Sequence, residues 1–290
     1  MNLIKWLNKN THSLKGKTVA VTGSTGGLGS ELCLFLAGLE ANLVLIDRNK
    51  QKSENLIKRL KKINGEISVK KVEADFEDAF SVKRAADELK KINIDIFIIN
   101  AAAYSIKRKK SALGLENVFQ INFVSPYYIV KELLAVNAKI KVVAVSSIAL
   151  KYSVTSRDDI DFKNKNASSL IYGNSKRFLT FSLMRLFKDS DRLSIVHPGI
   201  CFTNITAHYP KFIFAIIKYP MKIIFMSPKK AALSILRGVF ETTNQNEWIG
   251  PRLFNIWGLP NKKRLCCCKG DEIDFICSAS DMLYEKMKDL

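Results

Sequence analysis

The chain of 290 residues has no repeat, no low-complexity stretch and no linker that would divide it, so we expect a single domain. It also lacks the Cys-x-x-Cys spacing of many metal sites. Three of its six cysteines, Cys266 to Cys268, instead follow one another directly. No metal is therefore predicted. We expect reduced thiols, as in a cytoplasmic protein, with lipidation as the alternative if this segment lies against a membrane.

Long uninterrupted apolar runs are also absent. Residues 1–13 have no apolar core and no small-residue cleavage site, so no signal peptide is predicted. The most apolar stretch, Lys211 to Met226, is broken by two lysines and a proline and is too short to span a bilayer. This stretch, and the weaker amphipathic segment Asn2 to Leu7, could instead lie in a bilayer interface. The alternative for both segments is burial against the domain or a partner subunit, so peripheral membrane association stays open.

Acidic residues are scarce: 27 Asp and Glu stand against 46 Lys and Arg, which gives a net charge of +19. Such a balance can indicate binding to nucleic acid or to an anionic membrane. The basic residues are scattered, however, and no nucleic-acid-binding motif is present, so we predict solvated faces and no nucleic acid partner. The run Lys107 to Lys110 is interpreted as a solvated loop, with contact to phosphates as the alternative.

A glycine-rich turn lies between a predicted strand and a predicted helix near the N-terminus. The β-branched run Lys17 to Thr22 is followed by Gly23, Gly27 and Gly29, and then by the helical composition of Ser30 to Gly38. Glycines let the backbone approach a pyrophosphate, and the helix N-terminus supplies amides and a positive dipole end. Asp47 ends the next strand, 18 residues after Gly29, near the distance expected for a carboxylate on the adenine ribose. This arrangement predicts a dinucleotide site.

Tyr172 and Lys176 form a Tyr-x-x-x-Lys motif later in the chain. Four residues apart on a helix, their side chains share one face, about 5–6 Å apart at Cβ. A neighbouring ammonium favours the phenolate and lowers the pKa of a tyrosine from about 10. Tyr172 is therefore a candidate general acid and base. Alone, the motif is also compatible with an ordinary surface helix.

Strands and helices alternate through the first half of the chain, which predicts an α/β fold with a doubly wound, Rossmann-like parallel sheet covered by helices on both faces. Ligands of such sheets bind beyond the carboxyl ends of the strands. After the glycine turn and its helix, the expected strands are 42–46, 67–72, 94–100, 140–146 and 194–196, and the expected helices are 51–62, 79–91, 115–137, 169–188, 228–242 and 271–290.

In this order, the motifs resemble the short-chain dehydrogenase/reductase family, from about Leu14 to the C-terminal helix. The resemblance implies an N-terminal amphipathic extension over 1–13 and one family domain over 14–290, with a substrate lid at about 204–226. It also implies a coenzyme site. The residues assigned to that site are Gly23, Ser24, Thr25, Gly27, Leu28, Gly29, Asp47, Arg48, Asp75, Phe76, Asn100, Ala101, Ala102, Tyr172, Lys176, Pro198, Gly199 and Thr203.

The resemblance further implies a catalytic tetrad of Asn122, Ser147, Tyr172 and Lys176. Tyr172 would protonate a carbonyl oxygen in reduction and take a hydroxyl proton in oxidation. Lys176 would lower the pKa of the tyrosine and bind the nicotinamide ribose. Ser147 would stabilise charge on the substrate oxygen, and Asn122 would hold a water that links Lys176 to solvent.

Two details narrow the match. The acidic insertion Arg157 to Phe162 before the tyrosine is similar to an insertion found in the retinol dehydrogenase-like branch of the family. Ile99 and Ala102 depart from the family's usual Asn and Gly beside the coenzyme, which affects local geometry and not the chemistry.

The expected activity is hydride transfer between NAD or NADP and a lipophilic alcohol or carbonyl, such as a retinoid, a steroid or a long-chain compound. Asp47 favours NAD, whereas Arg48 leaves NADP open. The alternatives are a reductase of a polar metabolite or an acyl-thioester, and a non-catalytic coenzyme-binding sensor. A homodimer or homotetramer, formed through the helices that carry Asn122 and Tyr172, is a further expectation from the family.

Overall fold

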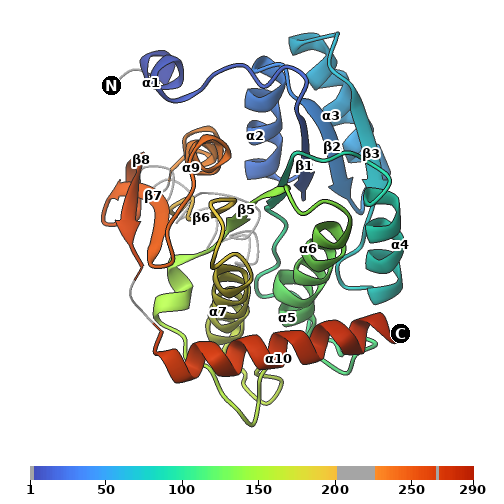
Figure 1. Ribbon diagram of the computed structural model, residues 1–290, viewed down its shortest axis with the longest axis vertical. Coiled ribbons are helices and arrows are strands. Elements are labelled where there is room, and N and C mark those ends of the chain that lie inside the picture. The colour runs from blue at the N-terminus through green and yellow to red at the C-terminus, as the bar shows by residue number, and fades with distance from the viewer. Residues whose placement is uncertain (1–2, 201–225, 266–267) are drawn as a thin grey trace, which may run out of the picture.

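The computed structural model describes residues 3–200, 226–265 and 268–290, and its centre is one eight-stranded sheet with the strand order β3-β2-β1-β4-β5-β6-β7-β8 (Figure 1). Every strand pairs in parallel except β8, which is antiparallel to β7. The strands are β1 Thr18–Thr22, β2 Asn42–Asp47, β3 Val69–Glu73, β4 Ile96–Ile99, β5 Lys141–Val145, β6 Leu193–Val196, β7 Glu247–Leu253 and β8 Trp257–Arg264.

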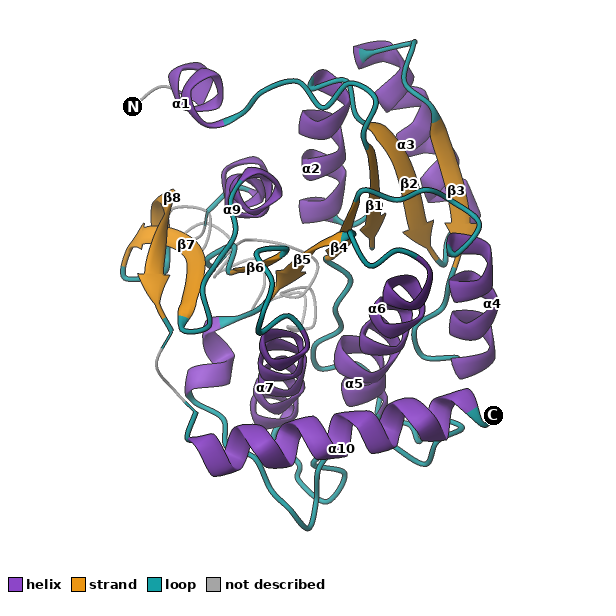
Figure 2. Ribbon diagram, viewed as in Figure 1, coloured by secondary structure: helices purple, strands orange, loops and turns teal. Residues whose placement is uncertain are grey.

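Helices cover both faces of the sheet (Figure 2). The helices are α1 Leu3–Asn10, α2 Gly27–Gly38, α3 Lys50–Ile63, α4 Ala79–Leu89, α5 Asn117–Phe119, α6 Ser125–Val136, α7 Ser168–Leu186, α9 Pro228–Phe240 and α10 Gly270–Lys288, with a π-helix η1 at Gln120–Val124 and a 3-10 helix η2 at Ile148–Lys151. Side chains alternate across β1: Val19 and Val21 pack with α2 and α9, and Ala20 packs with the α4, α6 and α7 side. The predicted doubly wound parallel sheet is confirmed.

Helix α10 lies across α6 and α7 as an additional outer layer (Figure 1). Its buried residues Ile276, Leu283 and Met287 belong to the same apolar cluster as those two helices. The Tyr284 ring lies 5.6 Å from the Tyr128 ring of α6. This helix fixes the outer face of α7, whose inner face carries the predicted tyrosine and lysine.

The N-terminal helix α1 turns its apolar face toward the domain. Trp6 is only 2% exposed and packs in the α2 and α9 cluster, with Leu3 and Leu7 beside it. Of the two alternatives for this amphipathic segment, the structure therefore favours burial over a free membrane-binding face. The predicted lid at 204–226, except for Met226, lies outside the described residues, and so do Cys266 and Cys267. Among the described residues, no helix combines the length and the apolar character needed to cross a bilayer.

Candidate active site and coenzyme site

The glycine turn joins β1 to α2 and leaves no room for side chains at two of its glycines. Gly23 has φ +62°, and a Cβ there would lie 2.9 Å from the Ala101 Cα. A Cβ on Gly29 would lie 2.9 Å from the Asn100 Nδ2 and would also meet the Gly23 carbonyl. The Asn100 amide donates to the carbonyls of Thr22 and Gly23, at 2.9 and 3.1 Å, and so fastens the turn to the end of β4. Gly27 begins α2, so the turn presents a helix N-terminus.

Asp47 is buried at the end of β2 and is bonded to the glycine turn. Its carboxylate accepts hydrogen bonds from the Ser24 hydroxyl, and from the Thr25 amide and hydroxyl at 3.0 and 2.9 Å. The Ser53 hydroxyl of α3 is 3.5 Å away. Asp47 was expected to bind the ribose, but both of its carboxylate oxygens already accept hydrogen bonds from the chain itself. Arg48, the next residue, is exposed.

The other coenzyme-site residues lie where the parallel strands end. Asp75 follows β3 and accepts from the Glu77 amide at 3.0 Å, and the carbonyl of buried Phe76 accepts from the Ser125 hydroxyl at 2.7 Å. Ala101 follows β4, and its amide donates to the Thr22 hydroxyl at 2.9 Å. Ala102 and Leu28 are half-buried, Leu28 against the α2 cluster. Thr22 was not among the residues assigned to the coenzyme site. Its hydroxyl nevertheless accepts from the amides of Asn100 and Ala101, and so joins the glycine turn to the segment after β4.

Tyr172 and Lys176 lie on α7 as the motif predicts. The Lys176 Nζ is 5.9 Å from the centre of the Tyr172 ring and donates to the Val145 carbonyl of β5 at 2.8 Å. Lys176 is 1% exposed, and burial lowers the pKa of its ammonium to about 7. The Tyr104 ring packs edge-on against the Tyr172 ring, 5.3 Å between centres. Tyr104, from the loop after β4, was not predicted.

Ser147 and Asn122 are placed on two elements that pack against α7. Ser147 follows β5 as the N-cap of η2, and its hydroxyl accepts from the Ala149 amide at 3.2 Å. Asn122 lies in the π-helix η1, a distortion that often marks functional sites. Its amide donates to the Ala103 carbonyl at 2.9 Å and to the Ser175 hydroxyl at 3.1 Å, and its oxygen accepts from the Ala103 amide at 2.7 Å.

Gly173, which the sequence analysis did not single out, determines how closely α7 approaches η2. A Cβ at Gly173 would lie 2.7 Å from both the Ala149 carbonyl oxygen and the Ser153 Cβ. Neither neighbour is a flexible side-chain end, so only glycine permits this spacing. Because Tyr172 precedes Gly173 and η2 follows Ser147, the contact sets the two candidate catalytic side chains relative to each other. In the sequence, the glycine directly after the tyrosine was the signal from which this close approach could have been predicted.

The segment after β6 contains the Pro198-Gly199 pair and a buried histidine. Gly199 has φ +85°, and a Cβ there would lie 2.8 Å from the Ile256 carbonyl oxygen. His197 stacks on Trp248 of β7, with ring centres 5.0 Å apart, and burial lowers its pKa to about 4, so the imidazole is neutral near pH 7. Pro198 is buried beside it, whereas Thr203 lies outside the described residues.

The acidic insertion before Tyr172 is folded onto the domain. The Asp161 carboxylate accepts from the Glu116 amide at 2.7 Å, and Phe162 is 1% exposed. Arg108, from the predicted solvated run, donates to the carbonyls of Lys163 and Lys165 at 2.7 Å each. At least this member of the basic run therefore serves to hold the insertion.

The residues of the glycine turn fit a dinucleotide. The turn has the close backbone approach that a pyrophosphate requires, and the buried Oδ1 of Asn100, beside it, has no hydrogen-bond partner among the described residues. A parallel sheet, a glycine turn on a helix N-terminus and a Tyr–Lys pair beyond β5 together define a nucleotide-binding α/β protein with a candidate proton donor.

Comparison with known proteins identifies the family. Residues 17–159 match the family model described as short chain dehydrogenase. An uncharacterised oxidoreductase of Schizosaccharomyces pombe is 26% identical over 258 residues, which cover 81% of this chain and 76% of that protein. Retinol dehydrogenase 14 of Mus musculus is 26% identical over 216 residues, which cover 67% of this chain and 64% of that protein.

Solved structures show the same fold. A putative uncharacterised protein of Mycobacterium paratuberculosis matches with a TM-score of 0.73 at 19% identity, and 96% of each chain is covered. The RhlG/NADP complex of Pseudomonas aeruginosa matches with a TM-score of 0.60 at 22% identity, covering 80% of this chain and 94% of that one. The chain belongs to the short-chain dehydrogenase family, with retinol dehydrogenases among its relatives, and it is an oxidoreductase that uses a nicotinamide coenzyme.

Proposed function

We propose that the protein interconverts a lipophilic alcohol and its carbonyl compound, with Tyr172 as the general acid and base. The observation that carries the proposal is the buried Lys176 ammonium beside the Tyr172 ring, 5.9 Å from its centre. A positive charge at this position favours the phenolate over the phenol. The lipophilic substrate class is supported by the retinol dehydrogenases among the relatives.

A bound nicotinamide coenzyme would supply or accept the hydride. The glycine turn and the N-terminus of α2 would hold its pyrophosphate. In the reducing direction the Tyr172 hydroxyl gives its proton to the carbonyl oxygen, and in the oxidising direction the phenolate takes the proton from the alcohol. Ser147 donates a hydrogen bond to the same oxygen as charge develops there. Asn122 keeps α7 and the loop after β4 together through Ser175 and Ala103.

Replacement of Tyr172 by Phe tests the proton-transfer step. We expect turnover to fall by at least about a hundredfold, because general acid–base catalysis contributes this much or more. Coenzyme affinity, measured by energy transfer from protein fluorescence to the nicotinamide, should change little. Substantial turnover in this variant would refute the role of Tyr172. Loss of both coenzyme binding and the folded-state circular dichroism would instead mean that the variant reports on folding, so Tyr172→His provides a second, polar replacement.

The contacts of Asp47 support NADP as the preferred coenzyme, rather than the NAD that its sequence position favours. To bind ribose hydroxyls, the carboxylate would have to give up its bonds to Ser24 and Thr25. Exposed Arg48 could meanwhile pair with a ribose phosphate, as guanidinium groups do.

Arg48→Gln tests this preference. We expect the KM for NADPH to rise about tenfold or more, because a charge-assisted pair with the phosphate is lost, while the KM for NADH stays within about twofold. Arg59→Gln, an exposed arginine on α3, is the matched control and should change neither value. Unchanged discrimination between the two coenzymes in Arg48→Gln would restore the interpretation in which Asp47 selects NAD.

A reductase of a polar metabolite is the alternative function. It would be supported by turnover of short polar carbonyl compounds with no rate on retinal or on long-chain aldehydes. Rates on the lipophilic compounds at least about tenfold higher would support the proposed class. Both series can be followed by NADPH absorbance with the same enzyme preparation.

A further inference from the structure

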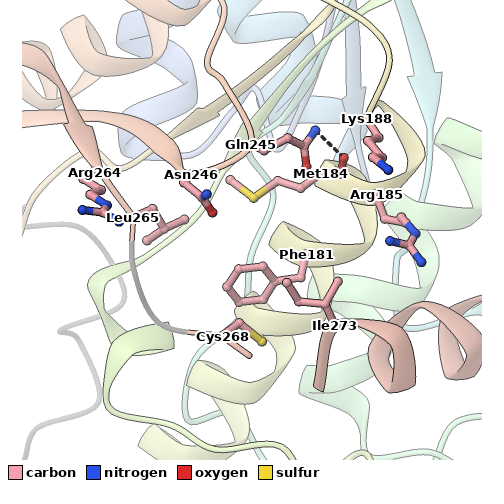
Figure 3. A pocket seen from close by; sticks show the side chains of 10 residues that line it. All are labelled: Phe181, Met184, Arg185, Lys188, Gln245, Asn246, Arg264, Leu265, Cys268 and Ile273. Carbon is pink, nitrogen blue, oxygen red and sulfur yellow. Dashed lines mark hydrogen bonds between the residues drawn. The ribbon is translucent and has the colours of Figure 1, made fainter. Parts of the chain in front are cut away.

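A cavity of about 390 Å³ lies between the second half of α7, the end of β8 and the start of α10 (Figure 3). Its apolar lining comes from α7, from α10 and from two described residues between β8 and α10. These residues are Phe181, Met184, Leu265, Cys268 and Ile273. The volume falls within the range of small-molecule sites, about 300–1,000 Å³. The cavity is therefore large enough for part of an elongated apolar molecule.

Three cationic side chains line the same cavity: Arg185, Lys188 and Arg264. In the view of Figure 3, Arg185 and Lys188 lie on one side of the apolar floor and Arg264 on the other. Arg185 pairs with Asp274 at 2.8 Å, but both partners are more than half exposed, so this pair is weak. No ion pair of Lys188 or Arg264 is found in the described part of the chain. None of the ten described residues that line the cavity is acidic.

Two side-chain amides, from Gln245 and Asn246, complete the polar rim. The Gln245 amide donates to the Met184 carbonyl near the C-terminal end of α7 at 2.9 Å, which fixes the loop before β7 against that helix. Hydrogen-bond donors and excess positive charge around an apolar floor are complementary to a molecule with an apolar body and an anionic head.

From this combination we propose that the cavity binds a lipophilic anion, namely a carboxylate or a phosphate monoester on an alkyl or aryl body. The apolar body lies on Phe181, Met184 and Ile273, and the head group pairs with Lys188 or Arg264. Met184 follows Tyr172 by twelve residues on α7, about 18 Å along the helix axis, so this site is separate from the reaction site. The proposal does not depend on the substrate assigned above.

Calorimetric titration of the full chain with dodecanoate and with dodecyl phosphate, at low ionic strength, tests the proposal. We expect one-to-one binding of at least one of the two anions, and the comparison shows which head group is preferred. The double variant Lys188→Gln/Arg264→Gln should lose at least about tenfold in affinity, because two charged donors are removed. Both residues are exposed, so the variant should melt at the same temperature as the wild type.

The matched control is Lys58→Gln/Arg59→Gln, which removes one exposed lysine and one exposed arginine from α3. It changes the net charge equally and should bind as the wild type does. If both double variants lose affinity equally, attraction is due to overall charge and the site is refuted. If neither anion binds the wild type, or if the cavity variant binds as well as the wild type, for instance because the anion enters the reaction site, the proposal is also wrong.

Discussion

Lys176 combines a proposed catalytic position with an unfavourable environment for its charge. It is 1% exposed, and burial lowers its pKa from the ordinary 10.5 to about 7. The unfolded chain therefore binds more protons at this residue than the folded chain between pH 7 and 10.5, so stability rises with pH in that window. The destabilisation is complete below about pH 7. The role proposed for Lys176 would therefore be maintained at the expense of stability.

We therefore expect Lys176→Met to abolish turnover and to stabilise the coenzyme-free protein by roughly 1–3 kcal/mol at pH 7, because an apolar chain replaces a buried ammonium. Urea unfolding at pH 7 and pH 9.5 measures the effect, which should shrink at the higher pH. Lys58→Met, at an exposed site on α3, should change stability by less than about 0.5 kcal/mol at either pH. A destabilised Lys176→Met protein at pH 7 would show that the bond to the Val145 carbonyl outweighs the desolvation.

The sequence alone is enough to propose which residues form the site, but it does not give their contacts. The order of Gly23, Asn122, Ser147, Tyr172 and Lys176 along the chain was enough to indicate the family and its coenzyme. The bonds from Asp47 to Ser24 and Thr25 depend on how β2 and the glycine turn lie side by side, which spacing alone does not give. From the sequence, the carboxylate was therefore interpreted as a ribose ligand by its distance along the chain alone, and the coenzyme preference stays a prediction.

At the level of elements, the strands and helices with regular burial were predicted closely, and irregular ones were missed. The predicted helix 115–137 is interrupted by the π-helix at Asn122, because apolar periodicity does not distinguish one inserted residue. The β7–β8 hairpin was not predicted. Gly250 and Pro251 weaken the strand signal of β7, and β8 is a charged edge strand.

Gly173 gives a prediction at this level, because it allows two elements to touch. Gly173→Ala should push α7 away from η2, cost about 1–3 kcal/mol of stability and lower kcat more than it changes coenzyme affinity. Gly270→Ala is the matched control, since a Cβ at Gly270 meets nothing within 4 Å and the residue begins α10. Thermal melts measure the change in stability, and steady-state kinetics on both variants measure the change in kcat and in coenzyme affinity. Equal behaviour of the two variants would mean that the contact between α7 and η2 is not tight.

At the level of the whole molecule, α10 determines which surfaces are available to a second copy. The expected interface through the helices of Asn122 and Tyr172 stays a prediction, but α10 of the same chain covers the outer faces of α6 and α7 (Figure 1). Buried Arg177 pairs with Glu272, and the Ser182 and Ser280 hydroxyls are 2.6 Å apart, so this helix is joined to α7 by polar contacts as well as apolar ones. A dimer built on these faces would have to displace it.

The packing of α10 therefore contributes to the stability of the layer formed by α6 and α7, and two adjacent residues test this contribution. Leu283 is 2% exposed against the core, whereas Met282 is 57% exposed. Leu283→Ala should lower the free energy of unfolding by about 2–4 kcal/mol, because it leaves a cavity between α10 and the core. Met282→Ala should change it by less than about 0.5 kcal/mol. If α10 were instead loosely held, both substitutions would be nearly neutral in urea unfolding, and the faces of α6 and α7 would be accessible to a partner subunit.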